Sequence, residues 1–234
     1  MRDTSGRGLD LYAYKNPLVS TAVPISEIPQ TRSANTRSLY TTGTEDVYSK
    51  PDEGLSRMVF ADFTIEAWVK FETLTGAQTI VGRDSLSRDQ GASALFYLSK
   101  TTHTKPGPGQ KENAFRVELV TRGDRSLLIE SEFRAATDTW YHLAVVGNVI
   151  AGKVTLFVDG RVVGTATDFD GLFVSPANPG WSFARGQYGG KTGDHLSGWI
   201  DEVRFSDTAL TPSQFLNSPP VSDSARGAKS SLAR

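Results

Sequence analysis

Two neighbouring carboxylates, Asp201 and Glu202, lie in the apolar segment SGWIDEVRFSD (197–207). A glycosidase uses two carboxyl groups that flank the bond it cleaves. Successive residues of a strand point to opposite faces of the sheet, so these two reach one glycosidic bond only if a β-bulge intervenes. We therefore interpret them as fold elements, with Asp201 facing the loops and Glu202 on the sheet surface beside Arg204.

Glu130 and Glu132 form a second candidate pair, because alternate residues of a strand share one face at a spacing of ~7 Å. The simpler interpretation is a solvated strand face. The sequence contains no nucleophile elbow, phosphate-binding loop, dinucleotide fingerprint or His-Glu-x-x-His motif. No catalytic residue is therefore predicted.

Any metal site must use oxygen ligands or histidine, because the chain has no cysteine, and its three histidines lie in separate segments. Calcium binds carboxylates and backbone carbonyls from loops. The best local cluster is TDFDG, with Asp168 and Asp170, and Asp194 is the predicted third ligand. An Asx-rich turn would use the same residue types, and Asp3 with Asp201 is an alternative pair.

Aromatic side chains near loops predict sugar binding, because the C–H face of a pyranose packs on an indole or phenol ring. The segment WSFARGQYGG (181–190) supplies two rings and two hydrogen-bond donors, and strand 63–71 offers a polar face that could hold a glycan. Trp199 is a further candidate, although it and Trp140 are expected to pack inside or to support a strand crossing. The predicted ligand-binding residues are Trp181, Arg185, Gln187, Tyr188, Trp68 and Glu66.

The composition excludes several classes of partner. With 25 basic and 26 acidic residues the net charge is −1, and no basic run offers a footprint for a phosphate backbone, so nucleic acid is not an expected partner. No window approaches 18 consecutive apolar residues, which argues against membrane insertion. The residues after Met1 lack the apolar core of a signal peptide.

Period-two alternation dominates the chain from residue 63 onward and predicts an all-β, antiparallel β-sandwich. In FTIEAWVKF (63–71) five apolar residues share one face. Asp159-Gly160 predicts a tight hairpin between strands 153–158 and 161–167. Residues 1–62 are predicted to be loops with one or two short strands, and Thr211-Pro212 begins one short helix. The other predicted strands are 77–82, 93–99, 114–120, 126–133, 140–147, WSFARG and SGWIDEVRF.

Four stretches, in order, resemble one family: FTIEAWVKF, TWYHLAVVGNVIAGKVTLFVDGRVVG, FARGQYGG and LSGWIDEVRFSDTALTPSQF. They are similar to laminin-G-like, concanavalin A-like jelly-roll domains. The resemblance implies one such domain over residues 1–216 and a flexible tail or linker over 217–234. It also implies that a calcium ion could bind at the rim. The glucanases of this superfamily carry carboxylates in a Glu-x-Asp-x-x-Glu pattern, which this chain lacks.

The resemblance implies a non-catalytic binding or adhesion module, for a carbohydrate, in a larger or multi-subunit extracellular or cell-surface protein. Two alternatives remain open at this point. One is a structural or assembly domain that makes protein–protein contacts. The other is a glycan-active hydrolase or lyase.

Overall fold

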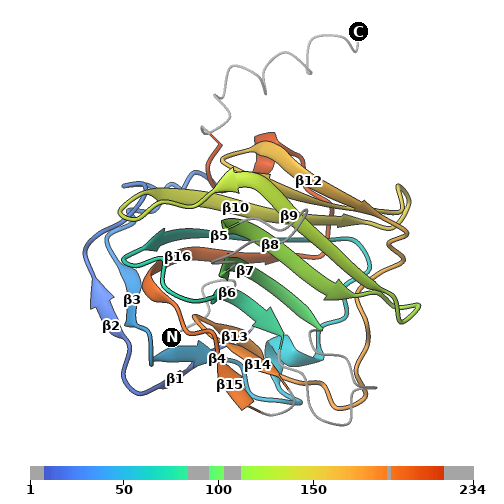
Figure 1. Cartoon of the computed structure of the whole chain (residues 1–234), viewed down its shortest axis with the longest axis horizontal. Helices are drawn as coiled ribbons and strands as arrows, with labels where there is room; N and C mark the ends of the chain where they lie inside the picture. Colours follow the sequence, from blue (N-terminus) through green and yellow to red (C-terminus); the bar gives the residue numbers. More distant parts are fainter. Residues whose placement is uncertain (1–7, 84–94, 103–111, 189–190, 219–234) are drawn as a thin grey trace, which may run out of the picture.

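The computed structural model describes residues 8–83, 95–102, 112–188 and 191–218. Within these residues, the strands form two seven-stranded antiparallel sheets and one small hairpin (Figure 1). Sheet I has the order β1 (Tyr12–Tyr14), β4 (Asp46–Tyr48), β13 (Trp181–Phe183), β6 (Gln78–Arg83), β7 (Phe96–Thr102), β8 (Glu112–Val120) and β9 (Ser126–Arg134). Sheet II has the order β12 (Arg161–Thr167), β11 (Lys153–Val158), β10 (Trp140–Asn148), β5 (Phe63–Phe71), β16 (Ser197–Ser206), β3 (Ser38–Thr42) and β2 (Leu18–Ser20).

The hydrophobic core lies between the two sheets, as the alternation of β5 predicts. Its five apolar residues, from Phe63 to Phe71, are fully buried in a cluster that includes Phe96 and Phe115 of sheet I. Burying one such side chain stabilises the fold by about 1.5–3 kcal/mol. The residues between them, such as Trp68 and Lys70, point to the outer face of sheet II. The expected antiparallel β-sandwich is confirmed.

The N-terminal third differs most from the prediction. Four short strands, β1 to β4, replace the expected one or two. Three of them have only three residues, too few for a period-two pattern to stand out. The segment 12–20 runs from β1, at one edge of sheet I, to β2, at one edge of sheet II (Figure 1).

The predicted C-terminal helix is a single turn of 3-10 helix, η2 (Pro212–Gln214), and a similar turn, η1 (Gly54–Arg57), precedes β5. Thr211 forms a capping box with Gln214 at the start of η2. The remaining hairpin pairs β14 (Gly186–Tyr188) with β15 (Lys191–Gly193). Most of the predicted tail, residues 219–234, lies outside the described part of the chain. Where the chain is described, it holds no helix long and apolar enough to cross a membrane.

The predicted hairpin turn joins β11 to β12. Asp159 has φ 50° and Gly160 has φ 76°, so both central residues adopt the left-handed conformation of a type I′ turn. A Cβ atom added at Gly160 would meet only Asn217 Nδ2, at an ordinary 3.6 Å. The cost of a side chain at this position is therefore conformational and not steric.

We expect Gly160→Val to lower the free energy of unfolding by about 1 kcal/mol or more, because a β-branched side chain disfavours positive φ. Thermal melting measures the effect. Gly160→Asn is the matched control, because asparagine tolerates this conformation and should lower the melting temperature less. Equal melting temperatures for the Val variant and the parent would contradict the turn assignment.

Candidate functional site

Asp201 and Glu202 do lie at a β-bulge, where the register of β16 against β5 shifts between Asp201 and Arg204. Glu202 adopts φ 46° there. Asp201 is buried, with Oδ2 accepting a hydrogen bond from Asn35 Nδ2 (2.7 Å) and Oδ1 accepting one from the Glu202 N–H (3.0 Å). Burial raises the pKa of both carboxyl groups, and the charge of Asp201 further raises the pKa of Glu202. The buried, hydrogen-bonded Asp201 supports the interpretation as a fold element.

The expected pair between Glu202 and Arg204 is wrong. Arg204 binds Glu66 of β5 instead, because the bulge removes Glu202 from the regular alternation that would have placed it beside the guanidinium. Arg204 Nε donates to Glu66 Oε1 at 2.6 Å.

Glu66, one of the predicted ligand-binding residues, is fully buried on the outer side of sheet II. Its Oε2 lies 2.9 Å from His142 Nε2 and accepts a hydrogen bond from the Leu216 N–H at 2.8 Å. These contacts fasten the segment 209–216, here named the C-terminal strap, onto the sheet. Phe215 of the strap packs against Ala144, Val146 and Phe157. The carboxylate of Glu66 is therefore hydrogen-bonded within the protein and is not exposed to a ligand.

A row of side chains crosses the outer face of sheet II away from the strap. The residues are directly opposite one another in five neighbouring strands, and such residues share one face of a sheet. Tyr40, Trp199, Lys70 and Trp140 are half-buried, and Leu18 is 57% exposed. At ~4.8 Å between strands the row is ~19 Å long. In order from β2 to β10 the row, here named the aromatic row, consists of Leu18, Tyr40, Trp199, Lys70 and Trp140.

Hydrogen bonds and stacking fix the aromatic row. The rings of Tyr40 and Trp199 lie 4.7 Å apart between centroids, and the Lys70 ammonium is 3.9 Å from the Trp199 centroid. Trp199 Nε1 donates to Ser20 Oγ at 3.1 Å, and Tyr40 Oη donates to the Glu72 carboxylate at 2.9 Å. The hydrogen bond to Glu72 raises the pKa of Tyr40. The row thus offers fixed rings, one cation and one anion on an outer face.

Trp199 and Trp140 lie on this outer face, so the first of their two expected roles, packing inside, is wrong. Trp68 shares the face, two residues before Lys70 on β5, and its ring forms a T-shaped pair with His142, with the ring centroids 5.2 Å apart. Sequence reasoning missed Tyr40, because it falls in a region predicted to be mostly loop. The alignment of the row follows from strand pairing between distant segments, so only the register reveals it.

The predicted residues of segment 181–190 are only partly brought together. Trp181 is fully buried in the core, against Phe60 and Phe205. Its ring therefore has no free face for a ligand. Arg185 is buried beside Asp46 (Nε to Oδ1 3.1 Å), and its NH1 donates to Gln187 Oε1 at 3.1 Å. The side chain of Tyr188 lies outside the described part of the structure.

The three predicted calcium ligands are not gathered at one site. Asp170 pairs with Arg125 at 3.2 Å and accepts a hydrogen bond from the Gly123 N–H. The Asp168 carbonyl accepts one from Arg125, while Asp194 follows β15 and its carbonyl accepts from the Thr79 N–H. In the described ranges no group of three or more histidine or acidic residues could hold a metal ion. Asp3, of the alternative pair, is not among the described residues.

The second carboxylate pair also fails to form an open acid/base site. Glu130 lies opposite Arg116 of β8, with Oε1 3.6 Å from Arg116 NH1. Arg116 NH2 also binds Glu118 at 2.7 Å. Glu130 thus belongs to an ion-pair network on the face of sheet I.

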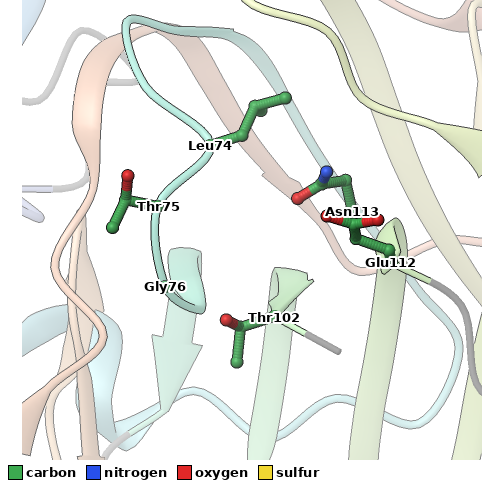
Figure 2. A pocket seen from close by; sticks show the side chains of 6 residues that line it. All are labelled: Leu74, Thr75, Gly76, Thr102, Glu112 and Asn113. Carbon is green, nitrogen blue, oxygen red and sulfur yellow. The ribbon is translucent and has the colours of Figure 1, made fainter. Parts of the chain in front are cut away.

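A cavity of about 340 Å³ opens at the end of the sandwich where β5 turns into β6 (Figure 2). One wall is the β5–β6 loop, and the others are the end of β7 and the start of β8. Lys100 is fully buried and holds the loop, with Nζ donating to the carbonyls of Leu74 (2.6 Å) and Gly76 (2.5 Å). The six lining residues are Leu74, Thr75, Gly76, Thr102, Glu112 and Asn113.

The family model for Laminin_G_3, of the concanavalin A-like lectin/glucanases superfamily, matches residues 33–215. The chain belongs to this superfamily. The match confirms the resemblance carried by the four sequence stretches. No curated protein matches the chain significantly.

Solved structures with a similar fold include the following three. Domain 4 of AbnA, an extracellular GH43 arabinanase from Geobacillus stearothermophilus, was solved with arabinotriose; it is 17% identical, with a TM-score of 0.62 over 92% of this chain and 90% of that one. A putative carbohydrate binding protein from Bacteroides ovatus is 21% identical, with a TM-score of 0.55 over 73% and 44%. The binding domain of botulinum neurotoxin DC, in complex with SialylT, is 13% identical, with a TM-score of 0.59 over 92% and 46%.

This concanavalin A-like domain therefore resembles carbohydrate-binding modules and toxin receptor-binding domains in fold. It spans less than half the length of the Bacteroides and toxin chains. At these identities the likeness extends to the backbone architecture and not to a shared site. The ligand-binding residues of this chain therefore have to be identified on its own surface.

Proposed function

We propose that the domain is a non-catalytic carbohydrate-binding module of a larger extracellular protein, and that it binds an extended glycan along the aromatic row. The observation that carries the proposal is the row itself. Tyr40, Trp199 and Trp140 lie in register with Lys70 between them across the outer face of sheet II. Because the Trp199 ring stacks against Tyr40 and lies under the Lys70 ammonium, the row meets a ligand mainly through ring edges, and this apolar platform can contact the C–H face of a sugar ring.

The polar groups beside the rings suit sugar hydroxyls. Lys70 donates only, while the Glu72 carboxylate accepts only and already orders the Tyr40 hydroxyl and Ser197 Oγ (3.0 Å). Each hydroxyl of a sugar both donates and accepts. An extended glycan would thus meet apolar rings below and charged partners at its sides. The length of the row, ~19 Å, leaves room for several sugar units.

The fold comparisons support the same function from a second direction. Two of the three similar structures were solved with a bound ligand, arabinotriose or SialylT, and the third is described as a putative carbohydrate binding protein. The arabinanase domain is part of a larger enzyme. A binding module that keeps such an enzyme on its polymer needs no acid/base pair of its own. The burial of Asp201 and the ion pairing of Glu130 are consistent with that role.

We expect a glycan array to show binding that falls at least tenfold in Trp199→Ala, because removing the indole removes the central ring of the platform. Tyr14→Ala is the matched control, since Tyr14 is half exposed on β1 of sheet I, off the row. Circular dichroism verifies that both variants remain folded. Incubation with the bound polysaccharide, followed by reducing-end detection, should show no turnover.

Equal glycan binding by the parent, by Trp199→Ala and by alanine variants of the other row residues would place the glycan elsewhere on the surface. Turnover of the polysaccharide by the parent would replace the binding module with an enzyme. Absence of binding to every glycan on the array would contradict the function itself.

A second candidate function is protein–protein assembly, favoured by the edge segment 12–20. It exposes Tyr14 (50%), Leu18 (57%) and Val19 (67%) beside the edges of both sheets. Exposed edge strands are templates for pairing with another chain. Light scattering of the parent and of Val19→Lys distinguishes the two functions. If the parent assembles through this edge, its molar mass in solution exceeds that of a monomer, and the added charge of Val19→Lys should lower it.

A further inference from the structure

We propose that the cavity between the β5–β6 loop, β7 and β8 is a separate binding pocket for a single sugar unit, which Asn113 and Glu112 recognise through two neighbouring hydroxyls. The proposal rests on the proposed function in one respect, since it takes the ligand to be a carbohydrate. The pocket itself lies apart from the aromatic row and is built from different strands. Figure 2 shows Asn113 and Glu112 together at one side of the cavity, facing the loop that carries Leu74.

The buried Lys100 decides how Asn113 points. Its ammonium has three donors and no acceptor, and they go to the carbonyls of Leu74 and Gly76 and to Asn113 Oδ1 (3.3 Å). An amide that turns its oxygen to the ammonium must turn its nitrogen away from it. The Asn113 oxygen is therefore held on the loop side of the cavity, and the two Nδ2 donors, turned away from the ammonium, are left for a ligand at the cavity rim. Lys100 acts on the ligand only by positioning this side chain.

Glu112 supplies the complementary acceptor. It is exposed at the start of β8, opposite Thr102 at the end of β7, and directly precedes Asn113 in the cavity wall. An amide donor next to a carboxylate acceptor matches two adjacent hydroxyls, each of which can accept one hydrogen bond and donate another. Among the described lining residues, Leu74 alone has a large apolar side chain, and polar groups of Thr75, Thr102, Glu112 and Asn113 are available to a polyhydroxylated ring.

The backbone of the cavity wall supports a built site. Asn113 adopts φ 53°, a conformation that asparagine tolerates, where the register of β8 against β7 shifts between Lys100 and Thr102. Its carbonyl accepts a hydrogen bond from the Ala135 N–H at 2.8 Å, which holds the residue in this conformation. Burial lowers the pKa of Lys100 to about 8, so the ammonium persists at neutral pH. The volume, about 340 Å³, lies at the lower end of the range of ~300–1,000 Å³ for small-molecule pockets.

The test is a titration of the full chain, followed in a ¹⁵N correlation spectrum, with glucose, galactose, mannose, xylose and arabinose. The Asn113 side-chain amide reports the pocket, and the Trp199 indole N–H reports the aromatic row in the same spectrum. We expect at least one of these sugars to shift the Asn113 amide saturably. Tetrahydropyran-2-methanol, a ring of similar size with one hydroxyl, should not.

Asn113→Asp is the decisive variant. It keeps the acceptor for Lys100, and therefore the fold, but replaces the two donors, so affinity for the sugar should fall by about tenfold or more. Glu112→Gln should also weaken binding. The matched control is Asn148→Asp at the far end of β10, where the side-chain oxygen that accepts from the Ala151 N–H is retained, and affinity should not change.

The outcomes separate this pocket from the aromatic row. Shifts of the Trp199 indole without shifts of the Asn113 amide would overturn the pocket and leave the proposed function intact. The Gly76 backbone amide reports the pocket in Asn113→Asp, which has no side-chain amide. Unchanged sugar affinity in that variant, read from the Gly76 shifts, would overturn the recognition by Asn113. Shifts at neither reporter with any of the five sugars would overturn the pocket.

Discussion

Glu66→Ala is expected to lower the free energy of unfolding by about 3–5 kcal/mol, measured by urea denaturation. The carboxylate is fully buried and receives Arg204, His142 and the Leu216 N–H. Its removal leaves a guanidinium, an imidazole and a backbone donor without their partner, beneath a strap that shields them from water. The cost is therefore that of stranded polar groups more than that of a lost attraction.

Glu27→Ala is the control for this prediction. Glu27 pairs with Arg32 at 3.4 Å, but both side chains are at least half exposed, so the change should cost less than about 1 kcal/mol. A double variant, Glu66→Leu with Arg204→Leu, should cost less than the sum of the two single changes, because it strands no charge. If Glu66→Ala lowered the free energy of unfolding as little as Glu27→Ala does, the C-terminal strap would not shield Glu66 and its hydrogen-bond partners from water.

Gly198→Ala is expected to destabilise the fold by about 4 kcal/mol, from overpacking and backbone strain together. A Cβ atom at this position would lie 2.1 Å from the Lys70 carbonyl oxygen, which is backbone of the neighbouring strand and cannot turn aside. Gly198 also has φ 151°, which side chains rarely adopt. The strand must therefore separate locally from β5, next to the aromatic row.

Gly193→Ala provides the comparison, because a Cβ atom there meets nothing within 4 Å. Its effect on unfolding in urea should stay within about 0.5 kcal/mol. If Gly198→Ala unfolded at the same urea concentration as the parent, the close approach of β16 to β5 would be refuted.

Local pattern predicted the strands and the hairpin well, because both depend on neighbouring residues. The alternation of FTIEAWVKF places its apolar face in the core, and Asp159-Gly160 forms the turn. From the sequence, a β-bulge at Asp201 could be considered only as an exception to the regular alternation of strand residues. Its position depends on pairing with β5, more than a hundred residues away, which no local pattern contains.

The candidate site was predicted less well, for physical reasons visible at single residues. Trp181 begins the predicted strand WSFARG directly after a Gly/Pro-rich loop, and the pattern does not say which way its side chain points. Packing against Phe60 and Phe205 decides that it points inward. Glu66 reads as part of a polar outer face, but the strap that covers it comes from residues 209–216. Tyr40 joins the aromatic row only through its cross-strand partner Trp199.

The position of β5 at the centre of sheet II has a kinetic consequence. Its two neighbours are β10 and β16, which follow it by roughly 70 and 130 residues, so the middle of the sheet closes through long loops, whose entropy slows folding. The hairpin of β11 and β12 can form alone within microseconds, but it docks at the rim. During synthesis, one edge of β5 therefore stays without its strand partner until β16 has left the ribosome, and its backbone donors and acceptors on that side remain unpaired throughout that interval.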